Sequence, residues 1–244
     1  MTLAKTISQF QPLAASTPAE CDRYYRDVHT RFARRFLRAM PNVRSYHVGL
    51  AESSYDVAGG WAAPPVTFRY VVLRFDPGTG LSVSPQLRER ITEDHRVFLR
   101  ELRGFSVQEE VLFDRLQGQT SLVKYQFEYD RRPGEPADAG ATRLEEQLDR
   151  LAALADEAFG LRLLVVDHVL FETGSEPVDE PGQRGTGERL AQTARQAFVE
   201  LYFDQPEWAE EWFVREEVRS ALLGEGWGLA RGVRIAEECG LDRR

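Results

Sequence analysis

Two histidines on the apolar faces of predicted helices have the residue type and position for acid–base chemistry. The spacing of apolar residues predicts a first helix over residues 17–39, and His29 lies one turn after Tyr25 within its apolar stripe. A second predicted helix, residues 84–103, carries His95 in the same way. Imidazole titrates near pH ~6.5, so either side chain suits general acid or base catalysis at neutral pH. The stripes are Cys21, Tyr25, Val28, Phe32 and Phe36 on the first helix, and Leu87, Ile91, Phe98 and Leu102 on the second.

A histidine on an apolar face has an alternative role, which is to pack in the core with its polar atoms satisfied. An unpaired buried polar group costs about 1–3 kcal/mol, so such a residue needs a partner. The corresponding helix of the second half, predicted over residues 142–159, carries only Leu and Ala at this place. Packing alone therefore does not require an imidazole at His29. Because the two histidine-bearing helices belong to one unit and face one sheet, we predict that His29 and His95 flank a single pocket as its catalytic residues.

Side chains near this pocket are expected to bind the substrate. Tyrosine hydroxyls and an arginine can donate hydrogen bonds to a phenolate, an enolate or a carboxylate, although packing explains each tyrosine equally well. His47 and His168 occupy matching places in an internal repeat and are expected to point to matching faces. The candidate substrate-binding residues are Tyr25, Tyr46, His47, Arg69 and Tyr70.

The chain resembles itself at three places in the same order, which indicates an old duplication. Residues 46–48 match 167–169, residues 68–76 match 196–204, and residues 104–111 match 232–239. Each half has the order strand–helix–strand–strand–helix–strand, which predicts an α+β fold of two ferredoxin-like βαββαβ repeats. Each repeat leaves one face of its antiparallel sheet bare, so the two sheets are expected to face each other and close one β-barrel with the helices outside.

The two predicted domains are residues 1–118, with the pocket, and residues 119–244, a degenerate second repeat. Thr17 is expected to start the first helix in a capping box, and Ser84 to start the second. Gly104 is expected to end that second helix, and Thr142 to cap the first helix of the second repeat. Stretches without periodicity, rich in Pro, Gly and acidic residues, are interpreted as mobile surface loops at 131–140 and 174–189, and residues 51–65 and 174–193 are given no role.

Composition and charge exclude several classes of function. The 244 residues carry a formal net charge of −8, which argues against nucleic acid as a partner. Only Lys5 and Lys124 among the 31 basic residues are lysines, and this arginine bias is ascribed to genomic base composition. No apolar run reaches the ~18 residues of a membrane span, no signal peptide is evident and two cysteines form no disulfide framework, so we expect a cytoplasmic protein. Four dispersed histidines without a CxxC or HExxH motif predict no metal site.

The segment ECDRYYRDVHTRFA, residues 20–33, resembles the helix of EthD-like proteins, which has an aromatic pair followed by a histidine. Here Tyr24 and Tyr25 stand for that pair and His29 for the histidine. The YDV segment at residues 55–57 and the following VVLRFD are similar to the YDG…FD segment of that family. The resemblance covers about residues 1–115, with Tyr in place of the commoner Trp, Val57 in place of Gly, and residues 57–65 resembling an insertion.

This resemblance implies the dimeric α/β-barrel superfamily, whose members include cofactor-free decarboxylases, dehydratases and cyclases of aromatic polyketide pathways. The leading hypothesis is therefore a cofactor-independent enzyme of specialised metabolism, in which His29 moves a proton on a phenolic or polyketide-like small molecule. One alternative is a cofactor-free oxygenase or a tandem-barrel haem protein with His168 as axial ligand. Another is a non-catalytic binding or assembly subunit, favoured if side chains fill the pocket. A homodimer is left open.

Overall fold

The computed structural model describes residues 3–13, 15–56, 60–62, 69–119, 121–177, 193–223 and 231–243. The strands of the first half are β1 (Ala4–Pro12), β2 (Val43–Asp56), β3 (Gly60–Ala62), β4 (Arg69–Phe75) and β5 (Leu99–Asp114). Those of the second half are β6 (Val123–Asp130), β7 (Leu161–Pro177), β8 (Arg195–Phe203) and β9 (Arg231–Asp242).

The first half has one interrupted helix after β1 and a second helix after β4. The first consists of α1 (Pro18–Tyr24), the π-helical turn η1 (Tyr25–His29) and α2 (Thr30–Arg38), and the second is α3 (Pro85–Phe98). The helices of the second half are α4 (Ala137–Ala155), α5 (Pro206–Phe213) and α6 (Glu216–Leu223). No helix in the described part of the chain is both long enough and apolar enough to cross a membrane.

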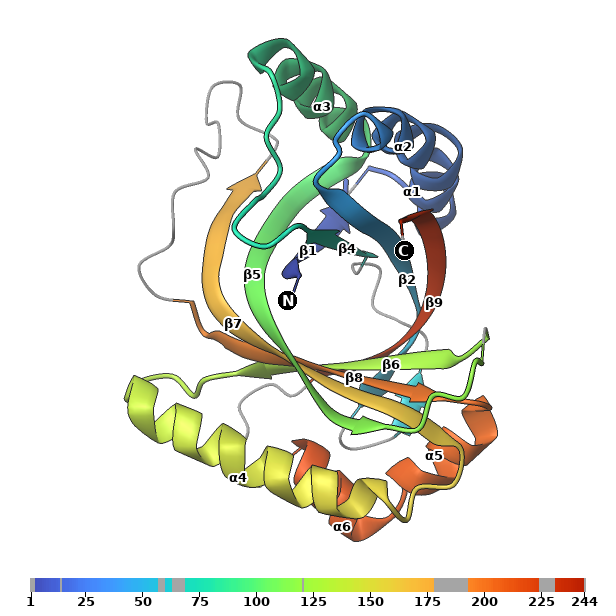
Figure 1. Ribbon diagram of the computed structural model, residues 1–244, viewed down its shortest axis with the longest axis vertical. Helices are drawn as coiled ribbons and strands as arrows, with labels where there is room; N and C mark the ends of the chain where they lie inside the picture. The colour runs from blue at the N-terminus through green and yellow to red at the C-terminus, as the bar shows by residue number, and fades with distance from the viewer. Residues whose placement is uncertain are drawn as a thin grey trace.

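All described strands belong to one antiparallel sheet that closes on itself. The strand order is β3-β2-β4-β1-β5-β7-β8-β6-β9, and β2 also pairs with β9, so every strand except the short β3 takes part in a barrel. The two halves meet at two seams, β5 with β7 and β2 with β9. In Figure 1 the barrel lies between two helical layers, with α1, α2 and α3 on one side and α4, α5 and α6 on the other. The predicted α+β barrel with outer helices is confirmed.

The strand registers are the same in the two halves. Lys5 of β1 lies opposite Arg74 of β4, and Lys124 of β6 lies opposite Tyr202 of β8. The same two lysines lie opposite Val107 of β5 and Ile235 of β9, which are members of the third internal match. The first internal match, residues 46–48 with 167–169, is not reproduced by the strand pairing. His47 lies opposite Val72, and Glu200 occupies the position of Val72 in the second half. The residue opposite Glu200 is Val165 rather than His168.

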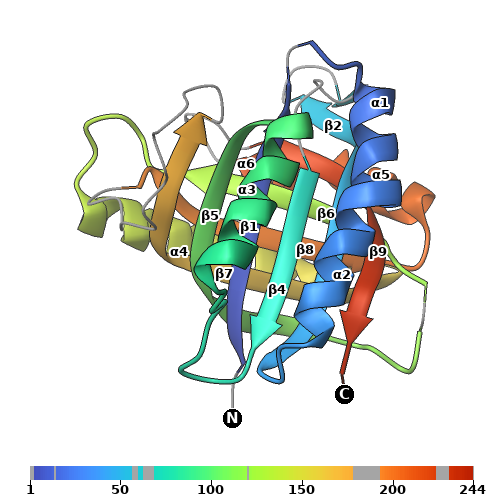
Figure 2. The ribbon, with the colours of Figure 1, turned by 90° about the horizontal axis from the view of Figure 1, so that it is seen from above.

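Apolar side chains fill three separate regions. One cluster lies between the first-half strands and α1, α2 and α3, and a larger one lies between the second-half strands and α4, α5 and α6. A third, which includes Ile7, Phe105, Phe198 and Val233, lies inside the barrel. Figure 2 shows α3 and the α1–α2 helix side by side over the first-half strands. The barrel wall therefore packs against helices on two sides of its outer face and against apolar side chains on its inner face.

Several predicted element ends are confirmed and others are corrected. Thr17 and Glu20 form the capping box, and the Ser84 hydroxyl accepts a hydrogen bond from the Leu87 N–H at 3.2 Å. The second helix ends at Phe98 rather than at Gly104, because the following residues pair with β1. Gly104 lies within β5, where a Cβ would come within 2.5 Å of Thr173 Oγ1.

The second half also departs from prediction in its first helix and its loops. Helix α4 begins at Ala137, after Pro136, so Thr142 is an interior residue and not a cap. Residues 137–140 of the first predicted loop are therefore helical, and residues 174–177 of the second continue β7. Of the predicted insertion at 57–65, residues 60–62 form β3, and the remainder lies outside the described residues, as do residues 178–189.

Candidate active site

His29 lies at the end of η1 and faces the first-half sheet. Its ring stacks on Tyr25 at a centroid distance of 5.0 Å and contacts the rings of Phe98 at 4.9 Å and His95 at 5.2 Å. Apart from Thr30, the buried residues of this helix follow a spacing of four, namely Cys21, Tyr25, His29, Ala33 and Leu37. Such a spacing turns by about 40° per step on a regular α-helix, and the wider π turn takes up part of that rotation.

The predicted apolar stripe of this helix is corrected at one position. Val28 was expected in the core, but it is 45% exposed, whereas His29 is 7% exposed. The spacing of three and four assumed a regular α-helix, and the π turn moves the buried face onto His29.

Asp94 of α3 pairs with His29 and was not predicted from the sequence. Asp94 Oδ2 lies 2.5 Å from His29 Nδ1, and Asp94 Oδ1 accepts a hydrogen bond from the Tyr24 hydroxyl at 2.8 Å. Burial opposes the negative charge, but the hydrogen bonds from His29 and Tyr24 hold the pKa of Asp94 below its usual value. A carboxylate at Nδ1 accepts the proton of that nitrogen, which leaves Nε2 of His29 as the basic nitrogen.

His95 lies beside His29 in a different electrostatic environment. Burial lowers the pKa of His95 to about 3, and the neighbouring His29 adds to this effect. His95 is therefore a neutral imidazole at physiological pH and can accept or donate one hydrogen bond without adding charge. We predicted that the two histidines flank one pocket, and in the structure their rings lie 5.2 Å apart.

Two buried tyrosine hydroxyls lie next to the histidines. Tyr25 is fully buried and Tyr46 is 2% exposed, and the Tyr46 hydroxyl lies near those of Tyr25 and Thr30. These three hydroxyls are close enough to interact with one another, but none of them makes a hydrogen bond of good geometry in the described part of the chain. Burial holds the pKa of Tyr25 well above its usual value and also raises that of Tyr46, so both remain neutral donors. Buried polar groups are nearly always paired, so this cluster is suited to a ligand or ordered water.

These side chains line a cavity of about 160 Å³ between the first-half sheet and its helices. Its polar wall consists of Tyr25, His29, Tyr46 and His95, with Ser8 of β1. The rest of the lining is apolar, from Phe10, Ala33, Phe36, Leu37, Val71, Leu73, Leu81, Ile91, Phe98, Leu99 and Leu102. The equivalent space of the second half holds a packed apolar cluster that includes Leu148, Trp212 and Phe213.

Three predicted substrate-binding residues lie elsewhere. Arg69 is on the helix side of β4, but it forms an ion pair with Asp22 of α1 and does not line the cavity. Tyr70 faces the barrel interior, where its hydroxyl donates to Glu128 at 2.5 Å. His47 also faces the interior and contacts Glu237 at 3.3 Å. Side chains alternate across a strand, so Tyr46 and His47 cannot share one face.

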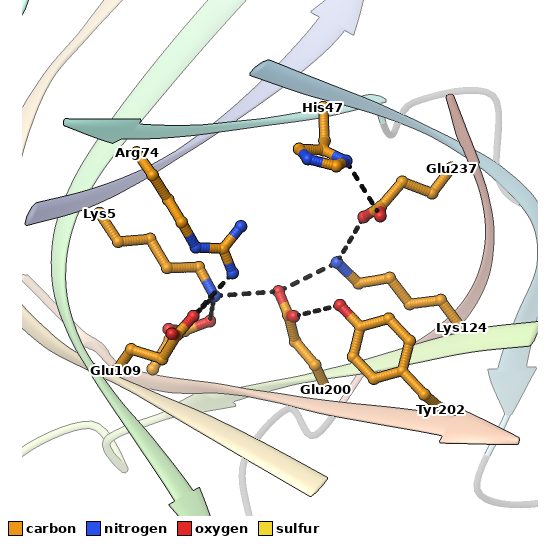
Figure 3. A network of polar contacts seen from close by, with 9 residues as sticks. Lys5, His47, Arg74, Glu109, Lys124, Glu200, Tyr202 and Glu237 are labelled. Carbon is orange, nitrogen blue, oxygen red and sulfur yellow. Dashed lines mark hydrogen bonds and ion pairs between the residues drawn. The ribbon is translucent and has the colours of Figure 1, made fainter. Parts of the chain in front are cut away.

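The barrel interior contains a network of charged side chains that the sequence did not predict. Lys5 Nζ lies 2.7 Å from both Glu109 and Asp167, and Lys124 Nζ lies 3.1 Å from Glu200 and 3.0 Å from Glu237. Figure 3 shows these contacts, with Arg74, Tyr202 and His47 around them. The available signal was that the two lysines of the chain occupy the second position of β1 and of β6.

His168 does not fit the role of an axial haem ligand. It lies on the outer face of β7, where its Nε2 is 2.9 Å from Glu110, and it is not part of the cavity. The expectation that it shares a face with His47 is wrong. Among the described residues no group of three or more His, Cys, Asp or Glu side chains could hold a metal ion.

Comparison with known proteins identifies the fold. No family model matches the chain, and no curated protein is significantly similar to it in sequence. A proposed monooxygenase from Lactobacillus acidophilus NCFM superposes with a TM-score of 0.50 at 11% identity, over 98% of this chain and 96% of that chain. One from Fusobacterium nucleatum subsp. nucleatum gives 0.51 at 7% identity, over 99% and 97%. An anthrone oxidase-like protein gives 0.51 at 11% identity, over 98% and 94%.

These structures share the fold of this chain and cover nearly the whole of it. The likeness therefore covers the whole closed antiparallel barrel, which is formed within this one chain. At 7–11% identity the likeness concerns the fold.

Proposed function

We propose that this protein is a cofactor-independent enzyme that uses His29 as an acid–base catalyst on a phenolic or polyketide-like small molecule. The observation that carries the proposal is the His29–Asp94 pair at the polar wall of an otherwise apolar cavity. A carboxylate that orients an imidazole and stabilises its protonated form is a recurring arrangement in proton transfer. Tyr24, which also donates to Asp94, fixes the orientation of that carboxylate.

The residues support a simple proton-transfer step. Nε2 of His29 removes a proton from the carbon next to a substrate carbonyl. The electron pair of that C–H bond forms a C=C bond, and the π pair of the C=O bond moves to the oxygen, which gives an enolate. In this proposal the hydroxyls of Tyr25 and Tyr46, which belong to lining residues of the cavity, donate to this oxygen. In a dehydration or cyclisation, the imidazolium returns the proton to the departing hydroxyl or to the newly formed alkoxide. His95, as a neutral imidazole, orients a second substrate hydroxyl.

Proton exchange tests this proposal before the physiological substrate is known. A panel of neutral phenolic ketones, 4-hydroxyacetophenone among them, is incubated in deuterium oxide, and deuterium incorporation next to the carbonyl is followed by NMR. We expect wild-type exchange to fall by about 10²–10⁴-fold in His29→Ala, the usual contribution of a general base. His168→Ala, on the outer face of β7, is the matched control and should exchange like wild type. Equal exchange in His29→Ala, or none in wild type with any panel member, contradicts the proposal.

A cofactor-free oxygenase is the second candidate, because two structural neighbours are proposed monooxygenases and a third is anthrone oxidase-like. The same His29–Asp94 pair could deprotonate a phenol before it reacts with O₂. Oxygen uptake with the same ketones and phenols, measured with an electrode, separates the two candidates. A non-catalytic assembly subunit would have been favoured by a pocket filled with side chains, but the pocket here is an open cavity.

We also propose that the chain is a tandem repeat of two ferredoxin-like units, residues 1–118 and 119–244, the first of them EthD-like. Three features support this proposal. The element order βαββαβ occurs twice, Lys5 and Lys124 have equivalent neighbours, and Glu109 and Glu237 contact the lysine of their own half. The second unit, with its filled helix–sheet space, serves mainly to complete the barrel.

A further inference from the structure

The lining of the cavity contains no side chain that could neutralise a ligand's negative charge. Of the described residues around it, none is Lys or Arg, and the ionisable groups are tyrosines held neutral and two histidines. Protonated His29 would be cationic, but Asp94 already balances that charge at 2.5 Å. A carboxylate placed in the cavity would lose its hydration without gaining a counter-ion, and an unpaired buried charge is costly.

Two arginines lie near the cavity, but neither of them lines it. The positive charge of Arg69 on β4 partly offsets the rise in the pKa of Tyr25, but Arg69 forms an ion pair with Asp22. The positive charge of Arg34 on α2 partly offsets the rise in the pKa of Tyr46, but Arg34 does not line the cavity. On α3, the charged group that faces the site is Asp94, which is negative. The two arginines therefore favour negative charge at the tyrosine hydroxyls from outside the lining, and neither is a lining residue that could pair with an anionic ligand.

The size of the cavity sets a second limit. Its volume of about 160 Å³ is close to the ~150 Å³ of an apolar cavity that binds one benzene ring. Phe10 and Phe98 line the cavity with their ring centroids 6.0 Å apart, and both belong to the packed core of the first half. The cavity thus has room for one aromatic ring with its oxygen substituents, and a fused three-ring system does not fit inside it.

We propose that the cavity binds a neutral, single-ring phenol or aryl ketone, with its oxygen at the Tyr25 and Tyr46 hydroxyls and its ring among the apolar side chains. This inference rests on the proposed function and narrows it. Substrates that carry a ring carboxylate are excluded, so the reaction is a dehydration, a cyclisation or another proton transfer, and not decarboxylation of an aromatic acid. Negative charge arises only during the reaction, when the tyrosine donors stabilise it.

Equilibrium binding of three probes to the purified protein tests the inference at pH 7. 4-Hydroxyacetophenone is the neutral ring, 4-hydroxybenzoate has nearly the same shape with an ionised carboxylate, and 1,8-dihydroxyanthrone is the three-ring compound. We expect the benzoate and the anthrone each to bind at least tenfold more weakly than the acetophenone in calorimetry or ligand-observed NMR. Comparable or tighter binding of the benzoate overturns the charge argument, comparable binding of the anthrone overturns the size argument, and no binding of the acetophenone overturns both.

Two variants locate the binding site. Tyr46→Phe removes one donor and should weaken acetophenone binding about tenfold, while Ala33→Phe adds a ring to the lining and should abolish it. His168→Ala should bind like wild type, and near-UV circular dichroism verifies that each variant is folded. Binding without proton exchange would leave this inference standing and contradict the proposed function. Proton exchange together with tight binding of the benzoate would support the proposed function and contradict this inference.

Discussion

At the residue scale, the chemistry depends on which groups surround each imidazole. His29 and His95 have rings 5.2 Å apart, but only His29 contacts a carboxylate. Burial and the neighbouring His29 lower the pKa of His95 to about 3, so that residue stays neutral. Two like residues with different environments thus take different roles, one as proton carrier and one as neutral hydrogen-bonding group.

Replacing Asp94 with Asn tests its role as a positioning residue. An amide can donate to Nδ1, which would leave the proton on Nε2 and remove the basic nitrogen from the cavity. We expect proton exchange on 4-hydroxyacetophenone to fall about 10²–10⁴-fold while binding of the ketone changes less than threefold. Glu93→Gln, an exposed carboxylate on the same helix, is the control. A loss of binding equal to the loss of exchange would indicate a merely structural role.

The same variant should change acid stability. Hydrogen bonds from His29 and Tyr24 outweigh burial and hold the pKa of Asp94 below its ordinary value of 3.8. A carboxyl group with a lowered pKa stabilises the fold above its ordinary pKa, and this contribution is lost as the pH falls through the lowered value. Wild type should therefore lose this part of its stability in acid, and Asp94→Asn should lack that loss.

At the element scale, the π turn η1 aligns Tyr25 and His29 on one face. Both residues are buried and stacked, four positions apart, at the polar wall of the cavity. π turns insert one residue into a helix and often occur at functional sites. The apolar periodicity predicted the helix but not this extra residue, because neighbouring α-helical spacings of three and four fit the same sequence.

Deleting Asp27, an exposed residue within η1, should convert the turn to regular α-helix. Tyr25 and His29 would then lie three positions apart, which places them about 60° apart round a regular α-helix instead of stacked on one face. We expect far-UV circular dichroism to show the helix retained and acetophenone binding to weaken at least tenfold. Asp27→Ala, which keeps the chain length, should bind normally. Full binding by the deletion variant would show that the π turn does not position the site.

Element ends were predictable where the signal is local. Thr17 and Ser84 cap their helices through hydrogen bonds to residues three positions away, and such contacts are written in adjacent sequence. The end of α3 was not predictable from the sequence. Residues 99–103 have ordinary helical character, but they form hydrogen bonds with β1 across the sheet. Long-range strand pairing overrides local propensity there.

At the scale of the whole molecule, buried charges join the two halves inside the barrel. Lys5 of the first half contacts Asp167 at 2.7 Å and Glu200 at 3.6 Å in the second, and His47 contacts Glu237 at 3.3 Å. Breaking a buried pair by removing one partner leaves an uncompensated charge and is strongly destabilising. The network therefore fixes how the two halves meet.

Asp167→Asn should make stability less dependent on pH. Burial and the charge of Glu200 raise the pKa of Asp167 to about 7, despite Lys5 beside it. A carboxyl group whose pKa is higher in the folded than in the unfolded protein stabilises the fold most at a pH below the unfolded-state pKa. This contribution is lost as the pH rises through the folded-state pKa. Between pH 5 and 8 we expect the free energy of unfolding of wild type to fall relative to Asp167→Asn by about 2 kcal/mol.

Urea unfolding at pH 5, 6, 7 and 8 measures this difference. Asp149→Asn, an exposed residue of α4, should follow the wild-type pH dependence. If the curves of wild type and Asp167→Asn stay parallel across this range, the carboxyl of Asp167 does not titrate inside the barrel as proposed.

The sequence by itself determined the alternating strands, the capped helices, the doubled element order and the histidines on apolar helix faces. These follow from side-chain periodicity and from contacts between near neighbours. The tertiary structure alone decided which face of each strand enters the barrel and which distant carboxylate meets each cation or imidazole. His29 and Asp94 are 65 positions apart, and His47 in the barrel interior meets Glu237 of β9, 190 positions along the chain. Partners of that kind depend on strand register and helix packing, which no local pattern encodes.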